Sequence, residues 1–266
     1  MNGLRGDMMK KTKLGRYVLS AALFILLSAG WVSAAPSAEV IPAEWMAASL
    51  ETLARGSSQV LLVTGDDSSG FHATLHLMEK KGGTWRSASP PLLAVIGEKG
   101  FAPPGAKKEG DIRTPSGGFA LKRTFGYDTS VPSRMPYRQA GKDDLWVDDA
   151  SAPDYNRWVR RGDTSAASFE VMKLNDDRYK YGIIIEYNTD PVVKGAGSAI
   201  FIHVRRGEGI PTLGCVALSE VDILKVLAWL DPAANPRAVL GTRDSLVSLT
   251  RSVQSQSGCP TDEGGR

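Results

Sequence analysis

Short apolar runs separated by turn-forming residues recur along residues 58–242, and their length favours strands over helices. From Phe71 to Met78 apolar and polar residues alternate, which is the period-two pattern of a strand with one buried face. Gln59 to Thr64 forms a continuous apolar run that ends at Gly65. The same reasoning predicts further strands at 85–88, 92–96, 118–123, 181–187, 199–204 and 237–240.

Helical spacing is clearest after Ser219. This residue and Asp222, three positions later, fit an N-terminal capping box. The apolar face of the helix would comprise Val221, Leu224 and Leu227, with Leu230 as a further candidate. The Asp-Pro pair at 231–232 predicts its end. A second, short helix is expected within 46–55, so the whole pattern predicts a mostly β chain with a few helices, an α+β fold.

The stretch 123–175 is polar, irregular and rich in aromatic residues. We interpret it as a long excursion over the sheet within the same domain, and long ordered loops of this kind are often functional. Aromatic and charged residues interleave in three parts of it, 135–139, 145–149 and 154–158. Two interpretations stay open: a lid or cleft wall for a substrate, or ordinary packing of an irregular segment.

The first 34 residues have the features of a secretory signal peptide. A basic stretch around Lys10 and Arg16 precedes an apolar run at 17–27, and Val32-Ser33-Ala34 offers small residues for cleavage. The run is short for a bilayer span, so an uncleaved membrane anchor is the weaker alternative. We expect cleavage after Ala34 and an exported protein in the periplasm or cell envelope, without stable membrane insertion.

The predicted organisation has four parts. A signal peptide at 1–34 is followed by an N-terminal lead-in at 35–57 and a folded domain at 58–242. The last part, 243–266, is rich in Ser, Gly and Gln near its end, a composition typical of a disordered tail.

Removing the signal peptide changes the charge. The full chain has 32 Lys and Arg against 29 Asp and Glu, a net charge of +3. Residues 1–34 hold five of the basic residues and one of the acidic ones, which leaves 27 against 28 and a net charge of −1. The apparent basicity therefore belongs to the targeting segment, and nucleic-acid binding is not expected.

Cysteine and histidine are scarce. Two cysteines are too few for a disulfide framework, and the three histidines have no spacing that matches a zinc site. Neither a metal nor another cofactor is expected. Cys215 lies in patterned sequence, whereas Cys259 lies in the predicted tail. A bridge between them is an alternative in an oxidising compartment, but it would block the Cys215 thiol.

Residues 198–218 carry the candidate chemistry. A predicted strand contains His203, a glycine-rich loop follows, and Cys215 stands twelve residues later. A free thiol ionises near pH ~8.5 and needs a base, and histidine has a pKa suited to take its proton. Gly214 leaves room for a carbonyl, and the N–H groups of Gly214 and Cys215 would form an oxyanion hole. We predict Cys215 as nucleophile and His203 as base; the alternative is a buried structural cysteine and a structural histidine.

Two motifs resemble the catalytic domain of YkuD-type L,D-transpeptidases. Thr212, Gly214 and Cys215 match the family's S/T-x-G-C signature, which follows a histidine on a strand. Residues 110–119, GDIRTPSGGF, are similar to the family's G-D-x-x-T-P-x-G-x-F segment. The two matches lie in the family's order and span about 110 to 218. By this resemblance the fold would be a mostly β, sandwich-like domain, with His203 as base and Cys215 as acylated nucleophile.

The nucleophile motif departs from the family pattern at two positions. Leu213 stands where many members have histidine, and Ala217 stands where many have arginine or asparagine. We hypothesise that Arg206, or its neighbour Arg205, grips the terminal carboxylate of the donor peptide instead, because arginine binds carboxylates with two hydrogen bonds. Thr212 is a further candidate for substrate binding.

The resemblance implies a cysteine acyltransferase that acts on the stem peptides of peptidoglycan and needs no cofactor. It also implies that carbapenems acylate Cys215. An L,D-carboxypeptidase or endopeptidase on the same scaffold would differ only in using water as acceptor. A non-catalytic cell-wall binding module is the alternative of another class. Papain-like hydrolases fit less well because they place the cysteine before the histidine.

Overall fold

The computed structural model of the chain describes residues 43–65 and 70–257, which belong to one compact unit. The predicted signal peptide, its cleavage site and Cys259 lie outside these residues. Within the described ranges, no helix combines the length and apolar character needed to cross a membrane.

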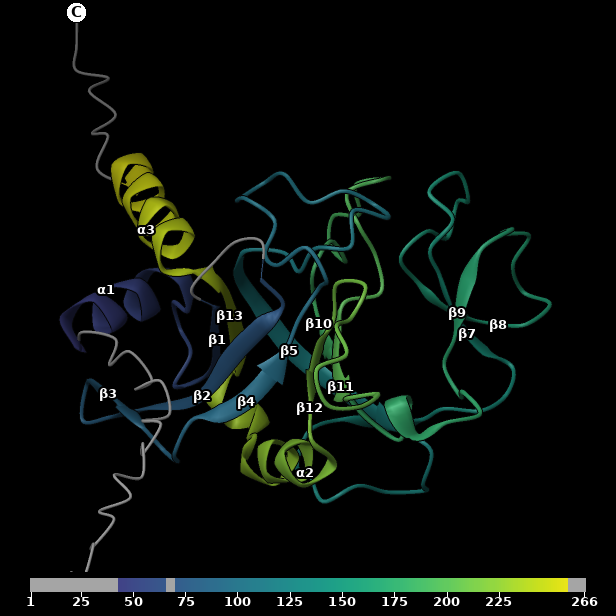
Figure 1. The fold of residues 1–266 in the computed structure, drawn as a ribbon, viewed down its shortest axis with the longest axis horizontal. Helices are drawn as coiled ribbons and strands as arrows, with labels where there is room; N and C mark the ends of the chain where they lie inside the picture. The colour runs from purple at the N-terminus through teal and green to yellow at the C-terminus, as the bar shows by residue number, and fades with distance from the viewer. Residues whose placement is uncertain (1–42, 66–69, 258–266) are drawn as a thin grey trace, which may run out of the picture. The chain divides into compact units, whose positions relative to one another are not determined.

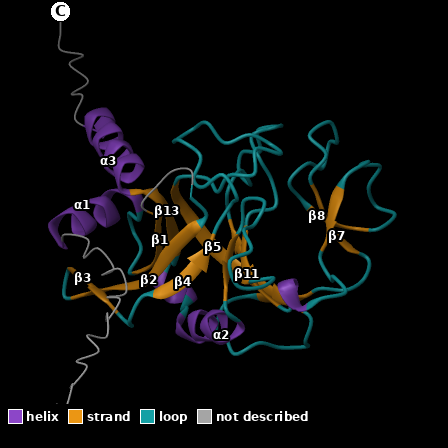
Figure 2. Ribbon diagram, in the orientation of Figure 1, coloured by secondary structure: helices purple, strands orange, loops and turns teal. Residues whose placement is uncertain are grey.

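The fold is mostly β with a few helices, as predicted (Figure 2). The helices are α1 (Ala43–Leu53), α2 (Glu220–Trp229) and α3 (Arg243–Ser257), with 3-10 turns η1 (Asp177–Tyr179) and η2 (Pro232–Ala234). The strands are β1 (Gln59–Gly65), β2 (His72–Lys81), β3 (Thr84–Ser87), β4 (Leu92–Val95), β5 (Gly117–Gly126), β6 (Tyr137–Gln139), β7 (Asp144–Val147), β8 (Trp158–Arg160), β9 (Phe169–Val171), β10 (Tyr181–Ile185), β11 (Phe201–Val204), β12 (Val216–Leu218) and β13 (Arg237–Thr242).

The main sheet returns on itself. Its strands follow the order β1-β13-β5-β10-β11-β12-β4-β2-β3, and β1 also pairs with β2, which closes a ring. β11 and β12 are parallel neighbours, with Ile202 opposite Val216. The candidate base and the candidate nucleophile therefore stand on, or next to, adjacent strands, although a glycine-rich loop separates them in sequence.

The apolar run of β1 is continuous because both faces of this strand are buried. Leu61 and Val63 point into the main core, while Val60 and Leu62 pack with Leu50 of α1. A strand covered on both faces needs no polar alternation. Figure 1 shows α1 and α3 side by side against this part of the sheet.

Helix α2 begins as predicted. The Ser219 hydroxyl accepts the Asp222 N–H at 3.1 Å, which satisfies one of the unpaired N–H groups of the first turn. The buried face differs from the predicted one: Ile223, Val226 and Leu227 are fully buried in the main core, whereas Val221 is exposed. Helix α2 follows β12, the strand directly after Cys215, and covers the main core there.

The structure differs from the predicted disordered tail over 243–257, where it places α3. The segment is polar on average, which favours a prediction of disorder. Leu246 is nevertheless fully buried against Leu50 and Val239, and Leu249 packs beside it. Leu246 and Leu249, three positions apart, give α3 one apolar face, and this face packs against α1.

The middle excursion is more regular than predicted. It adds β6 to the edge of β5 and forms a separate three-stranded sheet, β8-β7-β9, at the right of Figure 1. Trp146 and Asn156 are buried, and the indole N–H donates to the Asn156 amide oxygen at 2.8 Å. The same oxygen accepts the Ala199 N–H at 3.1 Å. The excursion is thereby tied to the backbone that leads into β11.

Candidate active site

Cys215 stands immediately before β12, and its side chain lines a cavity of about 210 Å³. The side chain is only 9% exposed. Its thiol donates to the Ala199 carbonyl at 3.2 Å, and its sulfur accepts the Phe201 N–H at 3.4 Å. The sulfur is thus held against the backbone around the start of β11, at the edge of a cavity large enough for several substrate atoms.

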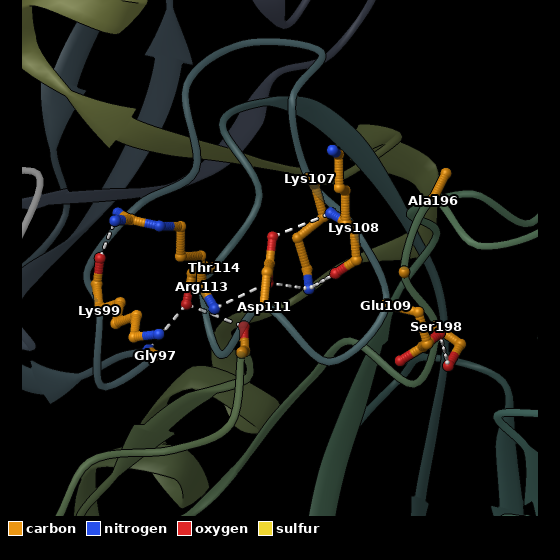
Figure 3. A network of polar contacts seen from close by, with 12 residues as sticks. Gly97, Lys99, Lys107, Lys108, Glu109, Asp111, Arg113, Thr114, Ala196 and Ser198 are labelled. Carbon is orange, nitrogen blue, oxygen red and sulfur yellow. Dashed lines mark hydrogen bonds and ion pairs between the residues drawn. The ribbon is translucent and has the colours of Figure 1, made fainter.

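The two motifs that resemble the family meet at this point. The Thr114 hydroxyl donates to the Gly214 carbonyl at 2.8 Å, across one hundred residues of sequence. It also accepts the Gly97 N–H at 2.9 Å, as Figure 3 shows. Thr114 is completely buried. One side chain therefore joins the G-D-x-x-T-P segment, the turn after β4 and residues 212–215, the loop of the candidate nucleophile (the nucleophile loop).

The nucleophile loop depends on a glycine at 214. Its φ of 148° lies in a region that residues with a Cβ rarely adopt, and a Cβ would come within 3.0 Å of the Arg113 carbonyl oxygen. The Thr212 hydroxyl closes the loop locally: it accepts the Gly214 N–H at 3.1 Å and donates to the Cys215 carbonyl at 2.6 Å. Of the two predicted oxyanion donors, the Gly214 N–H is thus already engaged, and the Cys215 N–H stays the candidate.

Asp111 organises the segment that carries Thr114. Its carboxylate accepts hydrogen bonds from the Lys107 ammonium at 2.6 Å and from the backbone N–H groups of Lys108 and Arg113 at 2.8 and 2.9 Å (Figure 3). Burial by itself would raise the pKa of this carboxyl, but the three hydrogen bonds outweigh it and hold the pKa below its usual range. This turn brings the Thr114 hydroxyl within hydrogen-bond distance of the Gly214 carbonyl.

His203 lies on β11, two residues after Phe201. Its Nδ1 is 2.8 Å from the Val204 carbonyl oxygen, so Nδ1 carries the proton and Nε2 is the basic nitrogen. Its ring meets the Tyr179 ring edge-on, with centroids 5.3 Å apart. Among the described residues, no hydrogen bond joins His203 to the Cys215 sulfur. A backbone carbonyl therefore orients the imidazole, and His203 is not among the residues that line the Cys215 cavity.

Burial keeps both groups neutral in the resting state. It lowers the pKa of His203 to about 4 and, together with the nearby Glu170 carboxylate, raises the pKa of Cys215 to about 12. A neutral imidazole is able to accept a proton at pH 7, and a neutral thiol is able to give one. Both groups are therefore uncharged at pH 7, and the resting site holds no thiolate-imidazolium pair.

The cavity walls contain charged residues that the sequence analysis did not single out. Lys107 and Glu109 come from the segment before Asp111, whereas Asp148 and Glu170 come from the middle excursion. Asp148 belongs to a part predicted to form a lid or cleft wall; it lines this cavity, and its role toward a substrate stays a prediction. Lys107 and Glu109 could have been found from their closeness to the motif. Glu170 has no local signal, because only the pairing of β9 with β7 brings it to Cys215.

The remaining predicted site residues lie elsewhere. Arg205 lines two other cavities, on the side of Leu93, and Arg206 is close enough to Asp176 to influence its pKa. Neither arginine lines the Cys215 cavity. Lys107 is the cationic residue of that cavity, and it already pairs with Asp111. The carboxylate-gripping role of Arg205 or Arg206 stays a prediction without support from this cavity.

A comparison with protein families agrees with the resemblance that the two motifs indicate. The family model YkuD, the L,D-transpeptidase catalytic domain, matches residues 68–243, which include Thr114, His203 and Cys215. The chain belongs to the YkuD family. Searches of curated proteins and of solved structures each returned no match.

Membership of the YkuD family has two consequences. The mostly β fold with three described helices is the architecture expected of such a domain. The family consists of cysteine transpeptidases that act on peptidoglycan peptides, so the chain has an L,D-transpeptidase-family function. The match begins at residue 68 and ends at 243, so α1, β1 and most of α3 lie outside it.

Proposed function

We propose that this chain is an exported cysteine acyltransferase that crosslinks stem peptides of peptidoglycan through a Cys215 thioester. His203 takes the thiol proton as the sulfur attacks the carbonyl of an L-centre in the donor peptide. The Cys215 N–H stabilises the oxyanion, and a D-residue leaves with a proton from His203. An acceptor amine then attacks the thioester and restores the thiol.

One observation carries this proposal. The Cys215 thiol borders a cavity at the point where Thr114 joins the two family motifs, and a neutral imidazole lies on the neighbouring strand. A structural cysteine would need neither the cavity nor the glycine-only backbone at 214. The two departures, Leu213 and Ala217, leave the thiol and imidazole in place: Leu213 is exposed at the cavity, and Ala217 is buried in the sheet opposite His203.

The decisive experiment is incubation of the purified protein with tetrapeptide muropeptides, followed by mass spectrometry of the products. Crosslinked dimers are the expected result. Tripeptides without dimers would replace transfer by hydrolysis, the L,D-carboxypeptidase alternative. Cys215→Ala is the control, and it should abolish either product. Products that persist in Cys215→Ala would rule out the thioester mechanism.

Acylation by a carbapenem tests the nucleophile separately. We expect one covalent adduct per chain by intact mass, located on Cys215 by peptide mapping and absent from Cys215→Ala. His203→Gln should slow adduct formation on the order of 100-fold, the usual contribution of a positioned base. Tight binding of peptidoglycan without any adduct or product would instead favour the binding-module alternative.

Export is part of the proposal. Its support is the pattern at residues 1–34, which precede the described residues. Expression of the full chain in a bacterial host, followed by N-terminal sequencing of the mature protein, should show a chain that begins after Ala34 and fractionates with the periplasm. A protein retained in the cytoplasm with its original N-terminus would remove this part of the proposal.

A further inference from the structure

The hydroxyl of Thr114 has a defined direction. A hydroxyl has one proton to donate and two lone pairs to accept. The Gly97 N–H takes up one lone pair at 2.9 Å, so the proton is free to point at the Gly214 carbonyl oxygen, 2.8 Å away. The Cys215 carbonyl oxygen is farther, at 3.4 Å. The main acceptor of the Thr114 proton is therefore the carbonyl of the peptide that joins Gly214 to Cys215.

Fixing the direction of the Gly214 carbonyl also fixes the direction of the Cys215 N–H. In a trans peptide the C=O and the following N–H point in opposite directions within one plane. With the Gly214 oxygen bound to Thr114, the Cys215 N–H is directed away from Thr114. Gly214 and Cys215 both line the cavity, so this N–H belongs to the peptide that borders it.

The nucleophile loop needs an external restraint of this kind. Gly214 has no Cβ, and glycine has more backbone freedom than any other residue. Thr212 holds the Gly214 N–H and the Cys215 carbonyl, which are the outer groups of the two residues. Thr114 holds the carbonyl between them. Without Thr114, this carbonyl would lose that hydrogen bond, and the plane of the Gly214–Cys215 peptide would have more freedom to rotate.

We infer that Thr114 is a positioning residue that aims the Cys215 N–H at the carbonyl oxygen of the donor. The inference rests on the proposed function, since it needs Cys215 to be acylated. In that step the S–C bond forms, the carbonyl electron pair moves to oxygen, and the thiol proton passes to His203. Thr114 touches none of these atoms. It acts through the peptide whose N–H receives the new negative charge, where a preorganised donor has its largest effect.

Two reactions of the same sulfur separate this role from a structural one. Acylation by p-nitrophenyl acetate passes through an oxyanion, whereas alkylation by iodoacetamide is a displacement at a saturated carbon and forms none. The rate of each is measured for Cys215, with the rate of Cys215→Ala subtracted as background. The acylation-to-alkylation ratio then reports on the oxyanion hole and cancels changes in thiol ionisation or access.

Thr114→Val keeps the shape of the side chain and removes the hydroxyl. We expect it to lower the ratio by about 10-fold or more, toward the ~100-fold loss seen when an oxyanion donor is removed. Thr114→Ser restores the hydroxyl and should return the ratio to within about twofold of the wild type. Thr124→Val is the matched control, because Thr124 is equally buried and its hydroxyl donates to the Pro136 carbonyl at 3.2 Å, away from the nucleophile loop.

Equal loss of both rates in Thr114→Val, or an unchanged ratio, would overturn the inference. A similar fall in the Thr124→Val ratio would do the same. Should Thr114→Val fail to fold by circular dichroism, Thr114→Ala removes the same hydroxyl without a methyl against the carbonyl and decides the question on the same ratio. A wild-type protein that p-nitrophenyl acetate does not acylate at Cys215 would contradict the proposed function itself, which is a different outcome.

Discussion

Burial and two charged neighbours shift the pKa of the Cys215 thiol. Burial has the largest effect and raises the thiol pKa, and the Glu170 carboxylate raises it further. Lys107, on the same cavity, acts in the opposite direction. Burial also raises the pKa of Glu170, while the Tyr179 hydroxyl donates to its Oε2 at 2.6 Å and holds the carboxyl in place. The resting thiol is therefore weakly ionised at pH 7.

Glu170→Gln should make Cys215 more reactive. Glutamine keeps an oxygen that accepts from the Tyr179 hydroxyl but removes the negative charge, so the thiol pKa should fall. We expect iodoacetamide alkylation of Cys215 at pH 8 to 9 to rise roughly threefold or more, with the pH-rate profile displaced to lower pH. Glu51→Gln on α1 is the charge control. A profile that stays in place would mean that Glu170 is uncharged over this pH range or does not influence the sulfur.

At the scale of elements, α1 packs closely on β5 because residue 118 is a glycine. A Cβ at Gly118 would lie 2.1 Å from the carbonyl oxygen of Leu53, the last residue of α1. The same strand pairs with β13 through Gly118 and Val239, and Val239 packs with Leu246 of α3. This glycine thus allows the end of α1, and through it the pair of helices, to sit against the sheet.

Gly118→Ala should destabilise the fold, because the new methyl meets backbone atoms that cannot move independently. We expect the free energy of unfolding to fall by about 1 to 3 kcal/mol, the usual range for overpacking, measured by urea denaturation. Gly207→Ala is the matched control, since its Cβ would meet only the flexible end of Ile210, at 3.0 Å. Equal free energies of unfolding for the two variants would show that α1 moves away from the new methyl without a loss of stability.

For the whole molecule, buried His203 links stability to pH. Its pKa is about 4 in the folded protein against an ordinary value of 6.5. As the pH falls from 6.5 toward 4, the unfolded chain binds a proton that the folded protein does not. Stability is therefore fully present above pH 6.5 and is lost as the pH falls through this window. Carboxyls with lowered pKa, such as Asp111, lose their contribution only at lower pH.

His203→Gln should flatten this part of the stability curve. The single group changes the free energy of unfolding by at most about 1.4 kcal/mol per pH unit. We expect the wild type to lose more stability than the variant between pH 6.5 and 4.5, as measured by urea denaturation at each pH. His76→Gln is the comparison variant, because burial lowers the pKa of His76 too but it stands on β2. Parallel curves for wild type and His203→Gln would contradict the neutral buried imidazole.

The sequence by itself determined the features that depend on local pattern. Period-two and continuous apolar runs located eight of the described strands, and the Ser219 cap located the start of α2. The two motifs identified the family, and they single out Cys215 and His203, whose catalytic roles remain predictions. These signals are readable because backbone periodicity and glycine or threonine chemistry act over a few residues.

Only the tertiary structure decided what distant segments do together. It placed Glu170 and Asp148 at the thiol, turned a polar C-terminal stretch into α3 and left Arg205 and Arg206 away from the cavity. It also joined Thr114 to Gly214 across one hundred residues. Such contacts depend on which strands pair and which faces pack, and loop closure over that distance leaves no periodic trace in the sequence. The predicted nucleophile was therefore visible in the sequence, whereas the groups that share its cavity were not.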